Sequence, residues 1–169
     1  MEYESLLIGI AEISIALTGF AGVVVVLGRR TSVPWPLTDQ FQLRSLIENG
    51  LLVVLAALLP FAVLQHTNEP SLIWRISSAI FGVAGGVHAF IIQGCRHRRL
   101  LRDPEATSDG LFPVAWTAVL VSMSAAVHGA LLLNAAGVVF HGTFGPYLYG
   151  LLWDLSMGAV FFLRLVRFS

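Results

Sequence analysis

Three acidic residues, Glu12, Glu48 and Asp154, lie in stretches of sequence that carry almost no other charge. Each stretch is long enough to cross a lipid bilayer, where a charged side chain is costly and therefore marks either a functional site or a polar contact between helices. Carboxylates in such a place can bind protons or cations. His128 is a suitable partner for one of them, because histidine changes its charge near neutral pH.

The depth of each polar residue follows from the helical rise of about 1.5 Å per residue. On this basis we expect Glu12, His128 and Asp154 in the outer half of the membrane, on three helices that could converge. Asn134, further out, could extend the same polar network. A second layer is expected in the inner half and consists of Glu48, Asn49 and His88. Two layers with a gap between them suit a proton or cation route, and they equally suit two structural hydrogen-bond networks.

Each of these residues also has a simpler, structural interpretation. Arg44 lies one helical turn before Glu48, so an i,i+4 ion pair accounts for Glu48. His88 lies beside glycines and can bond a backbone carbonyl. Glu12 and Asp154 have no basic residue within reach in their own helices, so each must be protonated, paired with another helix or hydrated by a cavity. The functional interpretation is therefore strongest for Glu12 and Asp154.

The composition places these residues in a membrane protein. Of the 169 residues, 56% are hydrophobic and only 12% are charged, whereas a soluble domain has about 45–50% apolar and about 25% charged residues. A spanning helix needs about 20 mainly apolar residues. Five segments qualify: Leu6–Leu27, Leu46–Leu64, Leu72–Gln93, Val114–Phe140 and Pro146–Val166. We therefore predict an all-α fold, a bundle of five transmembrane helices that forms one membrane domain over residues 1–169, without a soluble domain.

The arginines indicate how such a bundle is oriented. The sequence has ten arginines and no lysine. With five spans, all but one of the arginines fall on one side, and these are Arg29, Arg30, Arg44, Arg96, Arg98, Arg99, Arg102, Arg164 and Arg167. Arg75 falls on the other side, with Glu69 and the acidic N-terminus. Because basic loop residues stay in the cytoplasm, we predict an N-terminus outside and a C-terminus in the cytoplasm.

Two loops carry local signals. Asp39 and Gln42 match a capping box, which would begin the second helix at the membrane surface. The third loop, from Cys95 to about Pro113, is the longest and holds a basic cluster made up of Arg96, Arg98, Arg99 and Arg102. Such a cluster would contact anionic lipid at the cytoplasmic face. A site for a partner protein is the alternative.

The first span has a narrow face of small residues around its acid. Its members recur at helical spacing and are Ser5, Gly9, Glu12, Ala16 and Gly19. Membrane helices use small residues to approach one another closely, so close packing is one interpretation, and the alternative is that this face lines a pore. A five-helix bundle has little interior of its own, and for this reason we expect a homo-oligomer.

Several classes of function lack their sequence signature. There is no HExxH, GxSxG, P-loop or CxxC motif, so we do not expect an enzyme. His88 and His128 lie at different depths, which disfavours a bis-histidine haem, and a retinal protein needs a lysine. A metal site would have to draw Glu12, His128 and Asp154 from three helices, and we expect neither a metal nor a cofactor. No basic, aromatic-interleaved patch indicates nucleic-acid binding.

The N-terminal quarter resembles a known group of sequences. It contains Ala11-Glu12-Ile13, then Gly19-Phe20-Ala21-Gly22-Val23-Val24, then Arg29-Arg30, followed by Trp35 and Leu43-Arg44. This AEI, GFAGVV, RR pattern resembles a family of small bacterial multi-pass membrane proteins of uncharacterised activity. The resemblance implies a bacterial inner-membrane protein and implies no activity or functional residues.

Two functions from different classes follow. The first is a homo-oligomeric channel or transporter for protons or small cations, in which the Glu12 face lines or adjoins the route and Asp154 and His128 gate it. The second is a non-catalytic structural or interaction subunit of a larger membrane system. There the carboxylates would be hydrogen-bond contacts between helices, and the basic loop would dock a partner.

Overall fold

The computed structural model describes residues 3–28, 36–100, 102 and 114–167, and in these ranges the fold is all-α, without strands. The elements are α1 (Glu4–Gly28), α2 (Leu37–Leu64), α3 (Pro70–Gly86), the π-helix η1 (Val87–Gln93), α4 (Gly94–Leu100), α6 (Val114–Ala136) and α7 (Phe144–Arg167). Because α3, η1 and α4 follow one another without a break, they form one continuous helical rod.

Five helices are long and apolar enough to cross a membrane: Glu4–Val25, Leu37–Leu64, Pro70–Leu100, Thr117–Ala136 and Phe144–Val166. This confirms the predicted number of candidate spans, but several boundaries were wrong. The second helix begins directly after Pro36 and has no side-chain cap, so Asp39 and Gln42 do not form the predicted capping box. The third helix continues beyond Gln93 to Leu100. The fourth ends at Ala136, before Gly137 with its positive φ of 72°.

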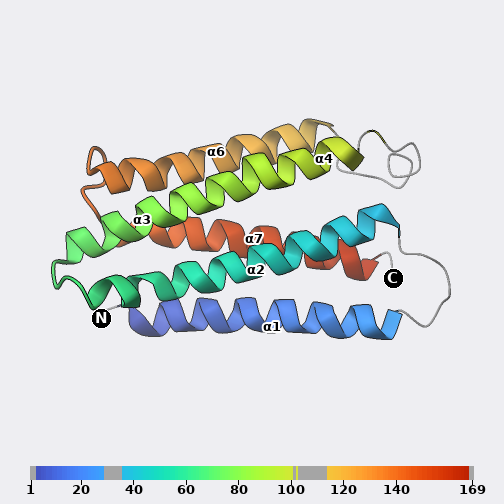
Figure 1. Ribbon diagram of the computed structural model, residues 1–169, viewed down its shortest axis with the longest axis horizontal. Coiled ribbons are helices and arrows are strands. Elements are labelled where there is room, and N and C mark those ends of the chain that lie inside the picture. The colour runs from blue at the N-terminus through green and yellow to red at the C-terminus, as the bar shows by residue number, and fades with distance from the viewer. Residues whose placement is uncertain (1–2, 29–35, 101, 103–113, 168–169) are drawn as a thin grey trace.

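Successive helices run in opposite directions and form two groups (Figure 1). One group is the α3–η1–α4 rod together with α6, and the other consists of α1, α2 and α7. We call the end that holds the start of α1 and the start of α3 the N-terminal end, and the end that holds α4 and the finish of α7 the C-terminal end. At the C-terminal end the two groups diverge (Figure 1).

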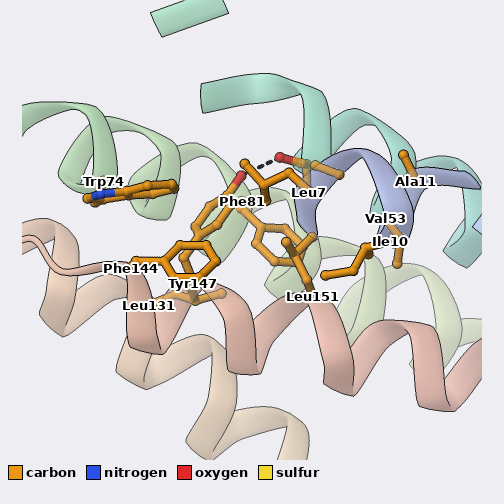
Figure 2. Packing of buried hydrophobic residues seen from close by; sticks show 12 residues of the cluster. Leu7, Ile10, Ala11, Val53, Trp74, Phe81, Leu131, Phe144, Tyr147 and Leu151 are labelled. Carbon is orange, nitrogen blue, oxygen red and sulfur yellow. Dashed lines mark hydrogen bonds between the residues drawn. The ribbon is translucent and has the colours of Figure 1, made fainter. Parts of the chain in front are cut away.

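The half of the bundle toward the N-terminal end is filled by a hydrophobic core to which both groups contribute (Figure 2). Its aromatic members come from α3 and α7: Tyr147 packs against Trp74 and against Phe81, with ring centroids 5.6 Å apart in both pairs. The Tyr147 hydroxyl donates a hydrogen bond of 2.5 Å to the Ala56 carbonyl of α2. The aliphatic members include Leu7, Val53, Leu131 and Leu151.

A second, smaller core lies toward the C-terminal end and belongs to one group alone. Its members come from α1, α2 and α7, and they are Ala21, Val25, Leu46, Phe161 and Leu165. The α4 and α6 helices contribute no residue to this core. The first core therefore joins the two groups at one end, whereas the second core lies within the group of α1, α2 and α7.

Candidate functional site

A cavity of about 160 Å³ lies between the two groups and extends from the middle of the bundle toward the C-terminal end. Residues of α2, of the α3–η1–α4 rod, of α6 and of α7 line it. The polar or titratable ones are Asn49, His88, Gln93, His97, Thr117, Ser124 and Asp154. Polar side chains from every helix except α1 therefore meet in one space.

The π-helix η1 provides one wall of this cavity. Its hydrogen bonds run from i to i+5, and single turns of this kind are frequent at functional sites. The longer turn brings His88 and Gln93, five residues apart, to the same side, with their Nε2 atoms 3.4 Å apart. Gln93 Oε1 accepts a hydrogen bond of 2.8 Å from Ser45 Oγ on α2. An ordinary α-helix would place residues five apart on different faces.

At the end of the cavity nearest the middle of the bundle, Asp154 of α7 faces His128 of α6. The side chains of Asp154 and His128 are 6% and 4% exposed, and Asp154 Oδ2 lies 3.9 Å from His128 Nε2. Neither atom has a hydrogen-bond partner. Buried polar atoms are normally hydrogen-bonded, so an unpaired one requires a specific explanation.

The histidine ring is held in one orientation. Its Nδ1 lies 2.8 Å from the Ser124 carbonyl oxygen, which can only accept, so Nδ1 carries a proton and donates it. Nε2 therefore bears the lone pair whenever the ring is neutral. On the other side the ring lies against the backbone of Gly85 in α3, where a Cβ atom would overlap Nε2. Gly85 thus leaves the space in which the ring faces Asp154.

Asn49 joins the two predicted layers into a single site. Its Nδ2 donates a hydrogen bond of 2.6 Å to the backbone carbonyl of Asp154, and both residues line the cavity together with His88. The expected gap between an outer layer and an inner layer was wrong. The second predicted span starts at Leu46, whereas α2 begins nine positions earlier, at Leu37. The depths predicted for the residues of this helix were therefore wrong.

Glu48 lies beside this site in a cluster of charges. Arg44 Nε is 2.9 Å from Glu48 Oε1, which confirms the predicted i,i+4 pair. Arg96 of α4 also binds Glu48 with both terminal nitrogens, and His88 Nε2 lies 3.4 Å from Glu48 Oε2. The Arg96 guanidinium thus forms an ion pair with a carboxylate on another helix. The prediction that it faces lipid with Arg98, Arg99 and Arg102 was wrong, because only those three are exposed.

Glu12 does not join Asp154 and His128, so the predicted convergence of the three residues was wrong. Its side chain is exposed, on the side of α1 opposite the buried Leu7 and Ser14. The small-residue face shares this orientation: Ser5, Ala16 and Gly19 are exposed and Gly9 is half-buried. No heavy atom of a neighbour lies within 4 Å of a Cβ built on Gly9 or Gly19. Among the residues that the structure describes, this face neither packs against a helix nor lines the cavity.

Asn134 is also separate from the cavity, because its amide holds the connection between α6 and α7. Nδ2 donates to Ser78 Oγ and to the Thr143 carbonyl, each at 2.9 Å. Oδ1 accepts from the Thr143 backbone N–H at 3.0 Å. Nearby, Arg75 Nε donates to the Ala135 carbonyl at 3.0 Å, at the end of α6. These bonds fix the N-terminal end, and the expectation that Asn134 extends the Asp154 network was wrong.

In the ranges that the structure describes, no group of three or more His, Cys, Asp or Glu side chains could hold a metal ion.

The cavity is also lined by residues for which no role was predicted. They include Thr117 and Ser124, which precede His128 by eleven and four positions and so lie on one face of α6. This spacing could have been recognised in the sequence as one polar face of the helix. Trp153, whose Nε1 donates to Ser124 Oγ at 3.0 Å, had no comparable signal.

Comparisons of the chain with protein-family models, with curated proteins and with solved structures found no match.

Proposed function

We propose that this protein moves protons or small cations across a bacterial inner membrane, using Asp154 and His128 as the site at which a proton is bound. The observation that carries the proposal is the pair of buried, unpartnered atoms, Asp154 Oδ2 and His128 Nε2, which face each other 3.9 Å apart at a cavity.

Membrane insertion is supported by the outer surface of the bundle. The five long apolar helices expose large hydrophobic side chains to the surroundings, among them Leu55, Ile91 and Leu163. Soluble monomers rarely expose contiguous apolar surface on this scale. The described arginines cluster at the C-terminal end, with Arg75 as the exception, so by the positive-inside rule that end, and the cavity with it, faces the cytoplasm. There Arg98, Arg99 and Arg102 would contact anionic lipid.

Proton binding follows from the chemistry of the two facing atoms. With His128 neutral and Asp154 ionised, a nitrogen lone pair faces a carboxylate oxygen, and both are acceptors. One added proton turns either atom into a donor toward the other, which removes the unfavourable contact. The two groups would then titrate as one coupled unit. The distance of 3.9 Å exceeds that of a hydrogen bond, so a small side-chain movement would accompany proton uptake.

In this arrangement, water would reach the site of Asp154 and His128 from one end of the bundle only. A cavity of about 160 Å³ has room for several waters, each of which occupies about 30 Å³ in the liquid. Such waters would connect Asp154 with the cytoplasmic face. Toward the N-terminal end the core around Tyr147 and Phe81 fills the bundle. Transport would therefore require a second arrangement in which the two helix groups separate at the N-terminal end instead.

The test is flux into liposomes that contain the purified protein and a pH-sensitive dye, with a potential imposed by potassium and valinomycin. We expect the wild type to acidify the lumen well above the rate of empty liposomes and Asp154→Asn to lower the rate at least about tenfold. Glu12→Gln is the matched control, because Glu12 lies outside the cavity. Wild-type rates equal to those of empty liposomes for protons, sodium and potassium would overturn the proposal, as would an unchanged rate in Asp154→Asn.

A second function, an interaction subunit, is favoured by the position of Glu12. A carboxylate that faces lipid is costly, and the small residues beside it would permit close approach of another helix. A second copy of the chain or a partner would then cover this face. Native mass spectrometry of the protein, extracted in mild detergent, tests this proposal. We expect an oligomer that Ala16→Leu dissociates, and a monomeric wild type without any bound protein would contradict the idea.

A further inference from the structure

The cavity beside Asp154 has features that a proton alone does not need. Its wall includes the aromatic side chains of Phe41, Phe90, Trp153 and Phe161. These come from three different elements, α2, η1 and α7, and they line the same cavity as Asp154. A chain of waters that carries a proton has no need of aromatic walls, yet much of the lining here is aromatic or aliphatic carbon.

The polar groups of the wall are largely used within the protein. Ser124 Oγ accepts from Trp153, Asn49 donates to a backbone carbonyl, and Gln93 contacts Ser45 and His88. Among the described lining residues, two buried polar atoms have no hydrogen-bond partner, Asp154 Oδ2 and Thr117 Oγ1. The described lining thus combines one acidic residue, Asp154, with several aromatic rings.

This combination suits an organic cation. Aromatic faces attract a cation through their quadrupole, and their best-known ligands of this kind are quaternary ammonium groups. A buried carboxylate supplies the balancing charge. The described lining residues include no arginine, and the sequence contains no lysine, so no permanent positive charge among the described lining residues competes. An inorganic cation such as Ca²⁺ takes about six to eight oxygen ligands, often several carboxylates, whereas the described lining holds one carboxylate, that of Asp154.

The volume sets the size of the ligand. A cavity of about 150 Å³ lined by apolar side chains is known to hold benzene. At about 160 Å³, this one would hold a molecule of about six or seven non-hydrogen atoms. Choline is of that size and tetramethylammonium is slightly smaller, whereas larger tetraalkylammonium ions exceed it.

We propose that the cavity binds a small organic ammonium cation, with Asp154 as its counter-ion and the rings of Phe90, Trp153 and Phe161 around its alkyl groups. This inference rests on the proposed function in one respect, because it assigns the substrate class of the same Asp154 site. A proton and the cation compete for one carboxylate, so binding of one releases the other. The other titratable groups at the site are His128 on α6, His88 on η1 and His97 on α4, with Glu48 and Arg96 behind His88.

Calorimetry on the purified full chain in lipid nanodiscs tests this inference, with choline and tetramethylammonium as probes. Dimethylbutanol, the uncharged carbon isostere of choline, is the control for charge, and tetrabutylammonium is the control for size. We expect both small cations to bind and both controls to bind at least about tenfold more weakly. No binding of either small cation, or equal binding of the isostere, would overturn the inference.

Two variants separate the carboxylate from the cavity wall. Asp154→Asn should weaken choline binding at least about tenfold, and Leu120→Trp, which fills the cavity but keeps the carboxylate, should abolish it. If both variants fold, as thermal melting will tell, and both bind choline as the wild type does, the assignment is wrong. Proton flux without choline binding would reject this inference and leave the proposed function standing. Choline binding without any flux would support this inference and reject the proposed function.

Discussion

The two halves of the bundle use polar groups in opposite ways. Toward the N-terminal end, Asn134 uses both its amide atoms in hydrogen bonds, and the Tyr147 hydroxyl reaches Ala56. From the middle of the bundle toward the C-terminal end, Asp154 Oδ2, His128 Nε2 and Thr117 Oγ1 are buried without a partner among the described residues, at or beside a cavity. Ser77 Oγ is an exception in the N-terminal half. Satisfied groups indicate structure, and unsatisfied groups around a cavity indicate a place where something binds.

The largest expected difference between the halves concerns stability. Leu131 is fully buried and packs against Gly82 and Gly150, so Leu131→Ala should lower the free energy of unfolding by about 2–5 kcal/mol. Leu120 already borders the cavity, so Leu120→Ala should cost less than about 1 kcal/mol, because few contacts are lost. Unfolding in mixed detergent micelles measures both. Equal losses would mean that the C-terminal half is packed as tightly as the N-terminal half.

An intermediate effect is expected from two neighbouring glycines of α3. A Cβ on Gly85 would overlap His128 Nε2, whereas a Cβ on Gly86 would have no neighbour within 4 Å. Gly85→Ala should therefore turn the imidazole away from Asp154 and lower flux by about tenfold, which corresponds to about 1.4 kcal/mol. Gly86→Ala should keep the wild-type rate in the same liposome assay. Similar flux rates for the two variants would show that transport does not depend on the position of the His128 ring.

The smallest effect concerns the charges beside the cavity. Arg96 is 20% exposed and links α4 to Glu48 of α2, whereas Arg44 is 68% exposed and lies on the same helix as Glu48. Arg96→Gln should lower the free energy of unfolding by about 1–2 kcal/mol, and Arg44→Gln by less than about 0.5 kcal/mol. Thermal melting of the two variants compares them. A larger loss for Arg44→Gln would show that the contact between helices adds little.

The number and type of helices could be predicted from the sequence, because an apolar run of spanning length is sufficient for that. The ends were harder to place, since Pro36 starts α2 without a side-chain cap and the rod continues through basic residues to Leu100. The rotation of a helix about its axis was hardest. The first helix is apolar on nearly every side, so its pattern could not tell whether Glu12 points inward or outward.

The candidate site could be predicted in part for the same reasons. Asp154, His128, Asn49 and His88 were selected because a polar residue in an apolar run is conspicuous. Their meeting at one cavity depends on helix rotation and on the π-helix, whose five-residue spacing between His88 and Gln93 does not follow the α-helical period. The role of Gly85 depends on a contact with another helix, which no local pattern records.

The central claim is that Asp154 exchanges a proton beside His128, and infrared difference spectroscopy during a pH titration tests it most directly. The protein in lipid vesicles should lose the C=O stretch of a protonated carboxyl group as the pH rises. That band should be missing from Asp154→Asn and retained in Glu12→Gln. Identical titration spectra for the wild type and Asp154→Asn would contradict the account.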